Sequence, residues 1–438
     1  MTDLDATPYL SGNYAPVPDE LTAVDLPVTG QIPAELSGRF LRNGPNPETT
    51  PDKETHHWFL GDGMVHGIRL RDGKAEWYRN RYVARVNPEA GYTPNTNVIG
   101  HAGRTFAIVE AGPKPVELTY ELESMHECDF EGTLAGSYSA HPKVDPLTGE
   151  IHAMCYWWPD MIDKLQYVVI GPDATVTKQV DIHTPTMPMI HDMSLTQTYA
   201  AVFDLPVTVD LEMALGGSPF PFSWQHEYNA RVGLLPRTAT SGDEVIWCEI
   251  DPVFAFHPMN AYDTDDGKVV IDICEYERIF DQDRNGPFRD GLPTLARWTV
   301  DPTTGRVARE TLDDRQQEFP RINDAVANQP YRYGYAAGVN RADDTVSFGD
   351  TFKHDMHTGT SEVRNHGDAR EAAEPIFVPR DGAKNEDEGW IMTLVYDGER
   401  DGSDLVILDA ADITGDEVAR IELPQRVPHG FHGNWVKD

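Results

Sequence analysis

Short runs of alternating polar and apolar residues, punctuated by glycine and proline, recur along this chain and limit it to a β-rich fold. Clear examples are residues 67–83, 267–277 and 404–410. Side chains of a strand point alternately to opposite faces, so this pattern predicts strands joined by tight turns. Turn sequences of the type DPxTG lie at 145–149 and 301–305, with a similar one at 397–402. The simplest interpretation is a series of antiparallel sheets.

Helical periodicity is scarce by comparison. The best helix candidates are residues 209–217 and 322–329, which we interpret as insertions between strands. No low-complexity linker divides the chain. We therefore predict one closed β domain over residues 1–438, most naturally a β-propeller.

The acidic composition excludes one class of function. Asp and Glu number 72 against 36 Lys and Arg, which gives a formal net charge of −36 at pH 7. Such a surface repels a nucleic-acid backbone, and it also repels an anionic membrane. We expect no nucleic-acid partner, and we interpret the charge as surface hydration.

The cysteines and the N-terminal residues predict the compartment. No CxxC pair occurs among Cys128, Cys155, Cys248 and Cys274, so neither a zinc cluster nor a disulfide framework is expected, and reduced thiols are favoured. The first ten residues carry acids where a signal peptide needs basic residues. No window reaches the roughly 18 apolar residues that a membrane span requires. These features predict a soluble, cytoplasmic protein.

Four of the sixteen histidines share a local setting. Each lies in a turn-like stretch beside an aromatic residue, proline or glycine: His141, His191, His257 and His432. They are too far apart to share one helix, so only the fold could gather them. In a propeller of about seven blades, the blade-entry loops converge on the central axis. Structural packing and a metal site both remain open; an all-imidazole site would suit iron, copper, zinc or nickel.

Several ordered motifs extend this pattern over nearly the whole chain. Together with the histidine segments, they are residues 12–20, 38–48, 57–67 and 424–435. These motifs closely resemble the carotenoid cleavage oxygenases, a family that includes apocarotenoid cleavers, lignostilbene dioxygenases and a retinoid isomerase. The resemblance implies a seven-bladed β-propeller with a helical and loop cap over the metal centre. It also implies one Fe(II) per chain, bound by the four histidines.

The resemblance further implies which residues surround the iron. Carboxylates that would accept N–H groups from ligand histidines match Glu110, Glu318 and Glu374. Such an acceptor fixes the tautomer, aims the ring and offsets the charge of the metal. Thr96 matches a threonine whose methyl group crowds one coordination position, and a threonine at a strand end would explain it equally well. Phe59 and Phe256 match aromatic residues that line a dry substrate tunnel, a role that we favour over a place in the core.

The activity implied is insertion of both atoms of O₂ across one C=C bond, which gives two carbonyl products without flavin, haem or 2-oxoglutarate. Lignostilbene cleavers resemble one another in a lysine that binds the substrate phenolate, and this chain has Val109 there. An apolar residue would leave a buried phenolate unpaired, so a carotenoid or apocarotenoid polyene is favoured. Stilbene cleavage is the alternative, with Tyr78 and Tyr82 to orient a phenol.

Two further alternatives and one possible partner stay open on the sequence alone. A propeller of this kind could bind a polyene without catalysis, or it could isomerise an ester as the retinoid relative does. Residues 211–224 are the best candidate for a transient apolar contact with a membrane, and an insertion packed on the propeller would explain them equally well.

Overall fold

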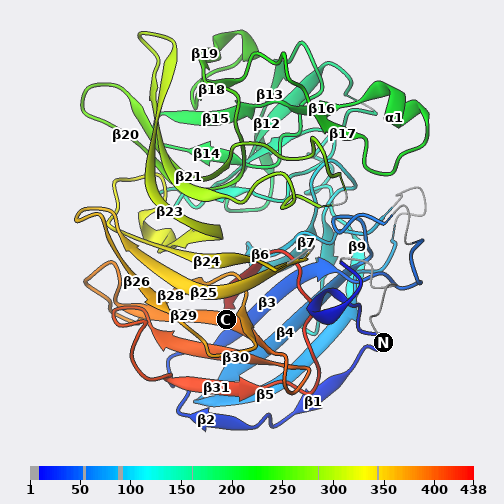
Figure 1. Ribbon diagram of the computed structural model, residues 1–438, viewed down its shortest axis with the longest axis vertical. Helices are drawn as coiled ribbons and strands as arrows, with labels where there is room; N and C mark the ends of the chain where they lie inside the picture. The colour runs from blue at the N-terminus through cyan, green and yellow to red at the C-terminus, as the bar shows by residue number, and fades with distance from the viewer. Residues whose placement is uncertain (1–8, 53–55, 87–91, 160, 285, 343–344) are drawn as a thin grey trace. The chain divides into compact units, whose positions relative to one another are not determined.

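The computed structural model describes residues 9–52, 56–86, 92–159, 161–284, 286–342 and 345–438 (Figure 1). Strands dominate throughout this part of the chain. The helical segments within it are one α-helix and three 3₁₀ turns: α1 (Leu211–Leu215), η1 (Gly12–Tyr14), η2 (Gly242–Glu244) and η3 (Asp324–Val326). The predicted all-β class is therefore confirmed.

The chain divides into two compact units, which we describe separately. The first unit contains Met1–Ala107, Val116–Glu127 and Arg332–Asp438. The second unit contains Ile108–Pro115 and Cys128–Tyr331.

One sheet of the first unit joins the two ends of the chain. Its strands lie in the order β1 (Thr22–Val24), β5 (Lys74–Tyr82), β4 (Gly63–Arg71), β3 (Gly38–Pro45) and β32 (Gly433–Lys437). Strand β32 is antiparallel to β3, with Arg42 opposite Gly433. This pairing ties the loop that carries His432 to a strand near the N-terminus.

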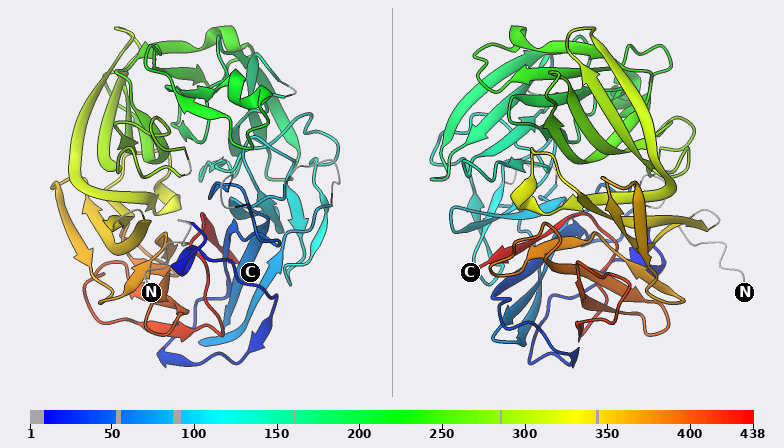
Figure 2. Two further views of the ribbon diagram at one scale, coloured as in Figure 1. Left: turned by 45° about the vertical axis from the view of Figure 1, so that its right-hand side comes forward. Right: turned by 90° about the vertical axis from the view of Figure 1, so that its left-hand side faces the viewer.

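The other strands of the first unit form three further groups. One sheet has the order β2 (Val28–Gly30), β31 (Ala419–Glu422), β30 (Gly402–Asp409), β29 (Gly389–Asp397) and β27 (Arg370–Ala372), and β28 (Ile376–Pro379) also pairs with β29. A second contains β6 (Asn97–His101), β7 (Arg104–Ile108), β8 (Val116–Leu118) and β9 (Ser124–Glu127). The third consists of β24 (Tyr333–Ala342), β25 (Thr345–Asp355) and β26 (Thr360–Arg364). Strands β29 to β31 run side by side in orange to red (Figures 1 and 2).

The second unit repeats a four-strand antiparallel pattern. Its first sheet is β10 (Lys143–Val144), β11 (Ile151–Cys155), β12 (Lys164–Ile170) and β13 (Val176–His183). Next along the chain come β14 (Met193–Leu195), β15 (Tyr199–Asp204), β18 (Arg231–Pro236) and β19 (Ile246–Glu249). They are followed by β20 (Phe254–Asp263), β21 (Val269–Tyr276), β22 (Thr294–Asp301) and β23 (Arg306–Ile322). A separate hairpin contains β16 (Val207–Val209) and β17 (Phe222–Trp224).

The turn sequences fall where the sequence predicts them. Residues 145–149 join β10 to β11, 301–305 join β22 to β23, and 397–402 join β29 to β30. The predicted helices are much shorter than expected. Residues 209–217 contain the five residues of α1, with Asp210 as its N-cap. Residues 322–329 contain only the 3₁₀ turn η3, because β23 extends to Ile322 and the Asn323 side chain then accepts from the Ala325 N–H.

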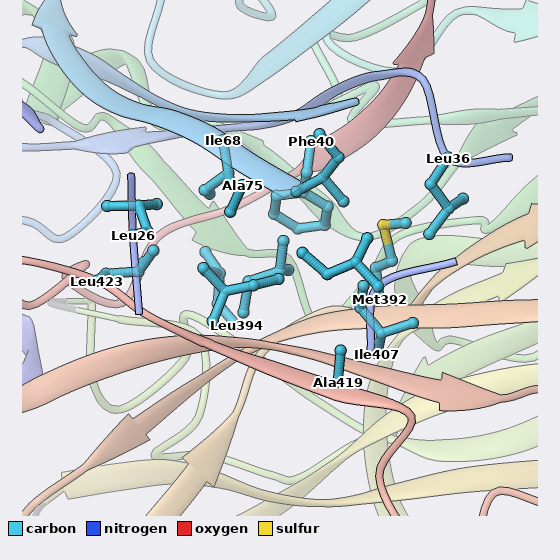
Figure 3. Close-up of a cluster of buried hydrophobic side chains, with 14 of the residues drawn as sticks. Leu26, Leu36, Phe40, Ile68, Ala75, Met392, Leu394, Ile407, Ala419 and Leu423 are labelled. Carbon is cyan, nitrogen blue, oxygen red and sulfur yellow. The ribbon is translucent and has the colours of Figure 1, made fainter. Parts of the chain in front are cut away.

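One buried apolar cluster of the first unit lies between two of its sheets. Phe40 and Ile68 from one sheet face Met392, Leu394 and Ile407 from the other (Figure 3). Alternation along each strand directs these apolar side chains inward. The cluster therefore anchors the strands that flank the loop of His432.

Replacing Ile407 by Ala should lower the free energy of unfolding by about 2–5 kcal/mol, because a fully buried side chain is replaced by a cavity. Urea unfolding followed by tryptophan fluorescence measures this change. The matched control is Val24→Ala at an exposed strand position, where we expect a change within about 0.5 kcal/mol. Equal losses for the two variants would contradict the assignment of this cluster as a core.

Candidate metal centre

Three of the predicted histidines come together in the second unit. His141 lies just before β10, His191 just before β14, and His257 within β20, so each stands at the first strand of a four-strand group. Their ring centroids are 4.5 to 4.9 Å apart, and all three are buried. Each offers one ring nitrogen, and these nitrogens lie within 4.8 Å of one another.

Carboxylates fix the orientation of two of these rings. Nδ1 of His257 lies 2.6 Å from Oε2 of Glu318, and Nδ1 of His191 lies 2.5 Å from Oε2 of Glu110. An ionised carboxylate only accepts hydrogen bonds, so in a neutral imidazole the proton belongs on Nδ1. Nε2 of each ring then presents a lone pair.

The two Nε2 atoms of His191 and His257 face each other at 3.0 Å. With the proton on Nδ1 in both rings, two lone pairs meet at this distance and repel. A cation between the rings converts this repulsion into attraction. The donor set therefore fits a transition-metal ion with imidazole ligands, such as iron, copper, zinc or nickel.

The third ring has an acidic neighbour that sequence reasoning missed. Nδ1 of His141 lies 3.8 Å from Oδ2 of Asp192, which is buried and 2.8 Å from Nζ of Lys143. Burial raises the pKa of Asp192, and the ammonium of Lys143 opposes that shift. The only sequence signal was its position directly after His191, which does not distinguish it among 72 acidic residues.

In the first unit, His432 has the same kind of carboxylate partner. Its Nδ1 lies 3.0 Å from Oε1 of Glu374, whose second oxygen accepts from the Gly433 N–H at 2.9 Å. The backbone N–H of His432 donates to the carbonyl of Thr96 at 3.0 Å. All three predicted glutamates thus lie beside a predicted histidine.

Thr96 is buried, and its hydroxyl is already engaged. Oγ1 donates to Oδ1 of Asn95 at 2.9 Å. The hydroxyl is therefore turned toward its neighbour, and the methyl group is the part of the side chain left for other contacts.

The two predicted aromatic residues occupy different surroundings. Phe256 packs edge-on against the ring of His191, with centroids 4.8 Å apart, and also contacts Tyr276. Phe59 packs against Phe431 at 5.5 Å and is only partly buried. Phe256 thus adjoins the histidine cluster of the second unit, whereas Phe59 belongs to an aromatic group of the first.

The predicted substrate residues also lie in different units. Val109 is buried in the second unit, directly before Glu110. Tyr78 is fully buried in β5, where its hydroxyl accepts from Gln425 and contacts Nδ1 of His66. The hydroxyl of Tyr82 accepts from Asn46 at 2.7 Å. Both phenols are therefore engaged within the first unit.

Replacing Glu318 by Gln should weaken the binding of a divalent transition metal by about 10–100-fold, because the acceptor that aims His257 loses its charge. Equilibrium dialysis with metal analysis measures this affinity. Glu275→Gln is the matched control, since that carboxylate lies on β21, the strand paired with that of His257, and binds Trp298 and Arg309. Unchanged affinity in the Glu318 variant would contradict the proposed orientation of the ring.

Comparisons with known proteins identify the family of this chain. Residues 14–437 match the model of the retinal pigment epithelial membrane protein family. The chain is 42% identical to a carotenoid cleavage oxygenase of Mycobacterium tuberculosis, over 98% of this chain and 97% of the relative.

Solved structures of oxygenases also superpose on this chain. A lignostilbene dioxygenase of Pseudomonas brassicacearum superposes with a TM-score of 0.90 at 29% identity, over 99% of both chains. Cobalt-substituted ACO of Synechocystis superposes with a TM-score of 0.85 at 27% identity, over 97% of both chains. From the family match and the 42% identity we conclude that this chain belongs to the carotenoid cleavage oxygenases of the retinal pigment epithelial membrane protein family.

Proposed function

We propose that this protein is a non-haem iron(II) dioxygenase that cleaves one C=C bond of a carotenoid or apocarotenoid to two carbonyl products. The observation that carries the proposal is the pair of imidazoles whose Nε2 atoms meet at 3.0 Å while carboxylates hold both Nδ1 atoms. Family membership supplies the reaction class.

The proposed ligand set is His141, His191, His257 and His432, with one ferrous ion per chain. All four are buried, and each offers one ring nitrogen to a metal. We include His432 because Nδ1 of its ring contacts the carboxylate of Glu374, as Nδ1 of His257 contacts the carboxylate of Glu318. Four neutral imidazoles leave the charge of the ion uncompensated, so Glu110, Glu318 and Glu374 offset it through the rings.

When bound, ferrous iron supplies the redox chemistry that activates O₂ for insertion into the alkene. The residues of the chain prepare the site for that chemistry. The carboxylates lie beside Nδ1 of three of the imidazoles and so aim their Nε2 lone pairs, and the methyl group of Thr96 limits access to one coordination position. Phe256 and Phe59 pack against the flat conjugated chain and exclude water from it.

We also propose the finer architecture that the family implies, a single seven-bladed β-propeller with a helical and loop cap. The consecutive four-strand antiparallel groups of the second unit are what propeller blades require. Histidines at the first strand of successive groups suit such blades, because their entry loops converge on the axis.

Val109 favours a polyene as the substrate. A stilbene phenolate buried beside this side chain would lack a cationic partner, at a cost of several kcal/mol. The hydroxyls of Tyr78 and Tyr82, which would have to orient a phenol, already have partners in the first unit. Stilbene cleavage remains the second candidate because the matched lignostilbene dioxygenase superposes over nearly the whole chain.

The location and the route of the substrate form a further part of the proposal. All four cysteines are buried thiols, which suits a reducing compartment such as the cytoplasm. Among the described residues, no helix is both long and apolar enough to cross a membrane. Leu211 and Leu215 of α1 are exposed apolar side chains, and we propose that residues 211–224 make a transient apolar contact with a membrane.

Protein reconstituted with Fe(II) and given an apocarotenal should consume O₂ and release two carbonyl products, which mass spectrometry identifies. His257→Ala should lose both iron and cleavage, because it removes a ligand and the partner of Glu318. His152→Ala is the control, since that buried histidine contacts the hydroxyl of Tyr167. Full activity without bound iron in the His257 variant would refute the proposal, and an iron-free wild-type protein that binds polyenes would favour the non-catalytic binder.

Replacing Val109 by Lys should shift the preference from apocarotenals toward phenolic stilbenes, because the ammonium supplies a partner for a phenolate. We expect kcat/KM for the stilbene to rise about tenfold or more relative to the apocarotenal, a change of about 1.4 kcal/mol. Val109→Met, which changes size without charge, is the matched control. An unchanged substrate ratio in the lysine variant would contradict the role of Val109.

A further inference from the structure

Three side chains of the N-terminal segment, residues 9–14, are buried although this segment begins the described part of the chain. Tyr9, Asn13 and Tyr14 are all at most 8% exposed. The single turn η1 (Gly12–Tyr14) has no side-chain hydrogen bond at its N-cap. Tertiary contacts must therefore hold this segment in place.

His429 holds Asn13 by two hydrogen bonds. The backbone N–H of His429 donates to the Asn13 carbonyl at 2.7 Å, and Nδ2 of Asn13 lies 3.3 Å from Nδ1 of the imidazole. An amide NH₂ group only donates, so Nδ1 accepts and the ring proton lies on Nε2. That Nε2–H donates to the carboxylate of Glu371. A chain of carboxylate, imidazole and amide, with Glu371 partly exposed and the other two residues buried, thus connects three distant segments.

This chain of hydrogen bonds lies next to the proposed iron ligand. Glu371 lies three residues before Glu374, and His429 lies three residues before His432. The pair Glu371–His429 is therefore followed in sequence by the pair Glu374–His432. The two carboxylate–imidazole pairs therefore hold the same loop, residues 429–432, at both of its ends. His429 fixes the end that contacts the N-terminal segment, and His432 belongs to the proposed site.

The N-terminal segment in turn covers an aromatic group. The Tyr9 ring stacks on Trp58 at 5.7 Å, and the Tyr14 ring meets Trp58 edge-on at 5.3 Å. Trp58 packs against Phe431 at 4.9 Å, and Phe431 packs against Phe59 at 5.5 Å. We call Trp58, Phe59 and Phe431 the aromatic wall. Phe59 is its partly exposed member, and Phe431 directly precedes His432.

We propose that Asn13, His429 and Glu371 form a latch that positions the aromatic wall and thereby determines which polyenes fit beside it. His429 and Asn13 are positioning residues: they act through residues 9–14 and Trp58 rather than by contact with the substrate. The inference rests on the proposed function, because it assigns the wall to the polyene chain. It explains why Tyr9, Asn13 and Tyr14 are buried in a segment with so little regular structure of its own.

The test compares Asn13→Ala and His429→Leu with the wild-type protein. Hydrogen exchange measured by mass spectrometry should show at least about tenfold faster exchange in residues 9–14, as expected for the loss of one buried hydrogen bond. The KM for an apocarotenal should rise about tenfold by the same reasoning, with kcat and iron content within about twofold of wild type. Glu371→Gln should leave both the exchange of residues 9–14 and KM at wild-type values, since the amide oxygen still accepts from Nε2–H.

His366→Leu is the matched control, because that buried histidine of the first unit bonds Thr351. It should change neither the exchange of residues 9–14 nor KM. Unchanged exchange in both latch variants would refute the latch. Faster exchange with unchanged KM, or a loss of iron and kcat at unchanged KM, would refute its role in specificity.

Two features keep the test decisive. Asn13→Ala alters a terminal segment, so it carries the test even if His429→Leu fails to fold. Exchange, and the affinity of the metal-free protein for a polyene measured by fluorescence quenching, do not require turnover. A wild-type protein that cleaves no polyene would therefore refute the proposed function, while the latch would still be judged on exchange and polyene affinity.

Discussion

The contact between a buried carboxylate and the N–H of an imidazole is the interaction on which this site depends. At His257 and Glu318 the two atoms are 2.6 Å apart, and both residues are buried. The carboxylate determines which nitrogen carries the proton and which presents a lone pair. Nδ1 of His191 likewise lies 2.5 Å from a carboxylate oxygen of Glu110, and Nε2 of the two rings lie 3.0 Å apart, so both rings direct Nε2 to one point.

Such an arrangement is unfavourable without an ion. A carboxylate removed from water requires a compensating charge, and two facing lone pairs repel. Glu318 accepts from the Tyr276 hydroxyl as well as from His257, which satisfies part of its capacity. A divalent cation between the rings would compensate the remaining negative charge and remove the repulsion between the lone pairs. The fold thus maintains a group of side chains that gains stability when a metal binds.

Aromatic and apolar side chains also adjoin this polar group. Phe256 lies against His191, and Val109 directly precedes Glu110. One short segment therefore carries both a carboxylate beside a candidate metal ligand and the side chain that we propose to select the substrate. A substitution at Val109 leaves the carboxylate of Glu110 in place, so the two proposed roles can be tested separately.

The sequence by itself indicated the β class, several strands and turns, and the candidate ligands. Alternation and the DPxTG turns are local properties of the backbone, so β10, β11, β22 and β23 could be predicted from residues close together in the chain. The histidines and glutamates were found through motifs that resemble a family. Only the tertiary structure decided how they meet, because His257 and Glu318 are 61 residues apart. The contacts of Asp192 and His429 could not be predicted for the same reason: packing rather than local sequence brings their partners to them.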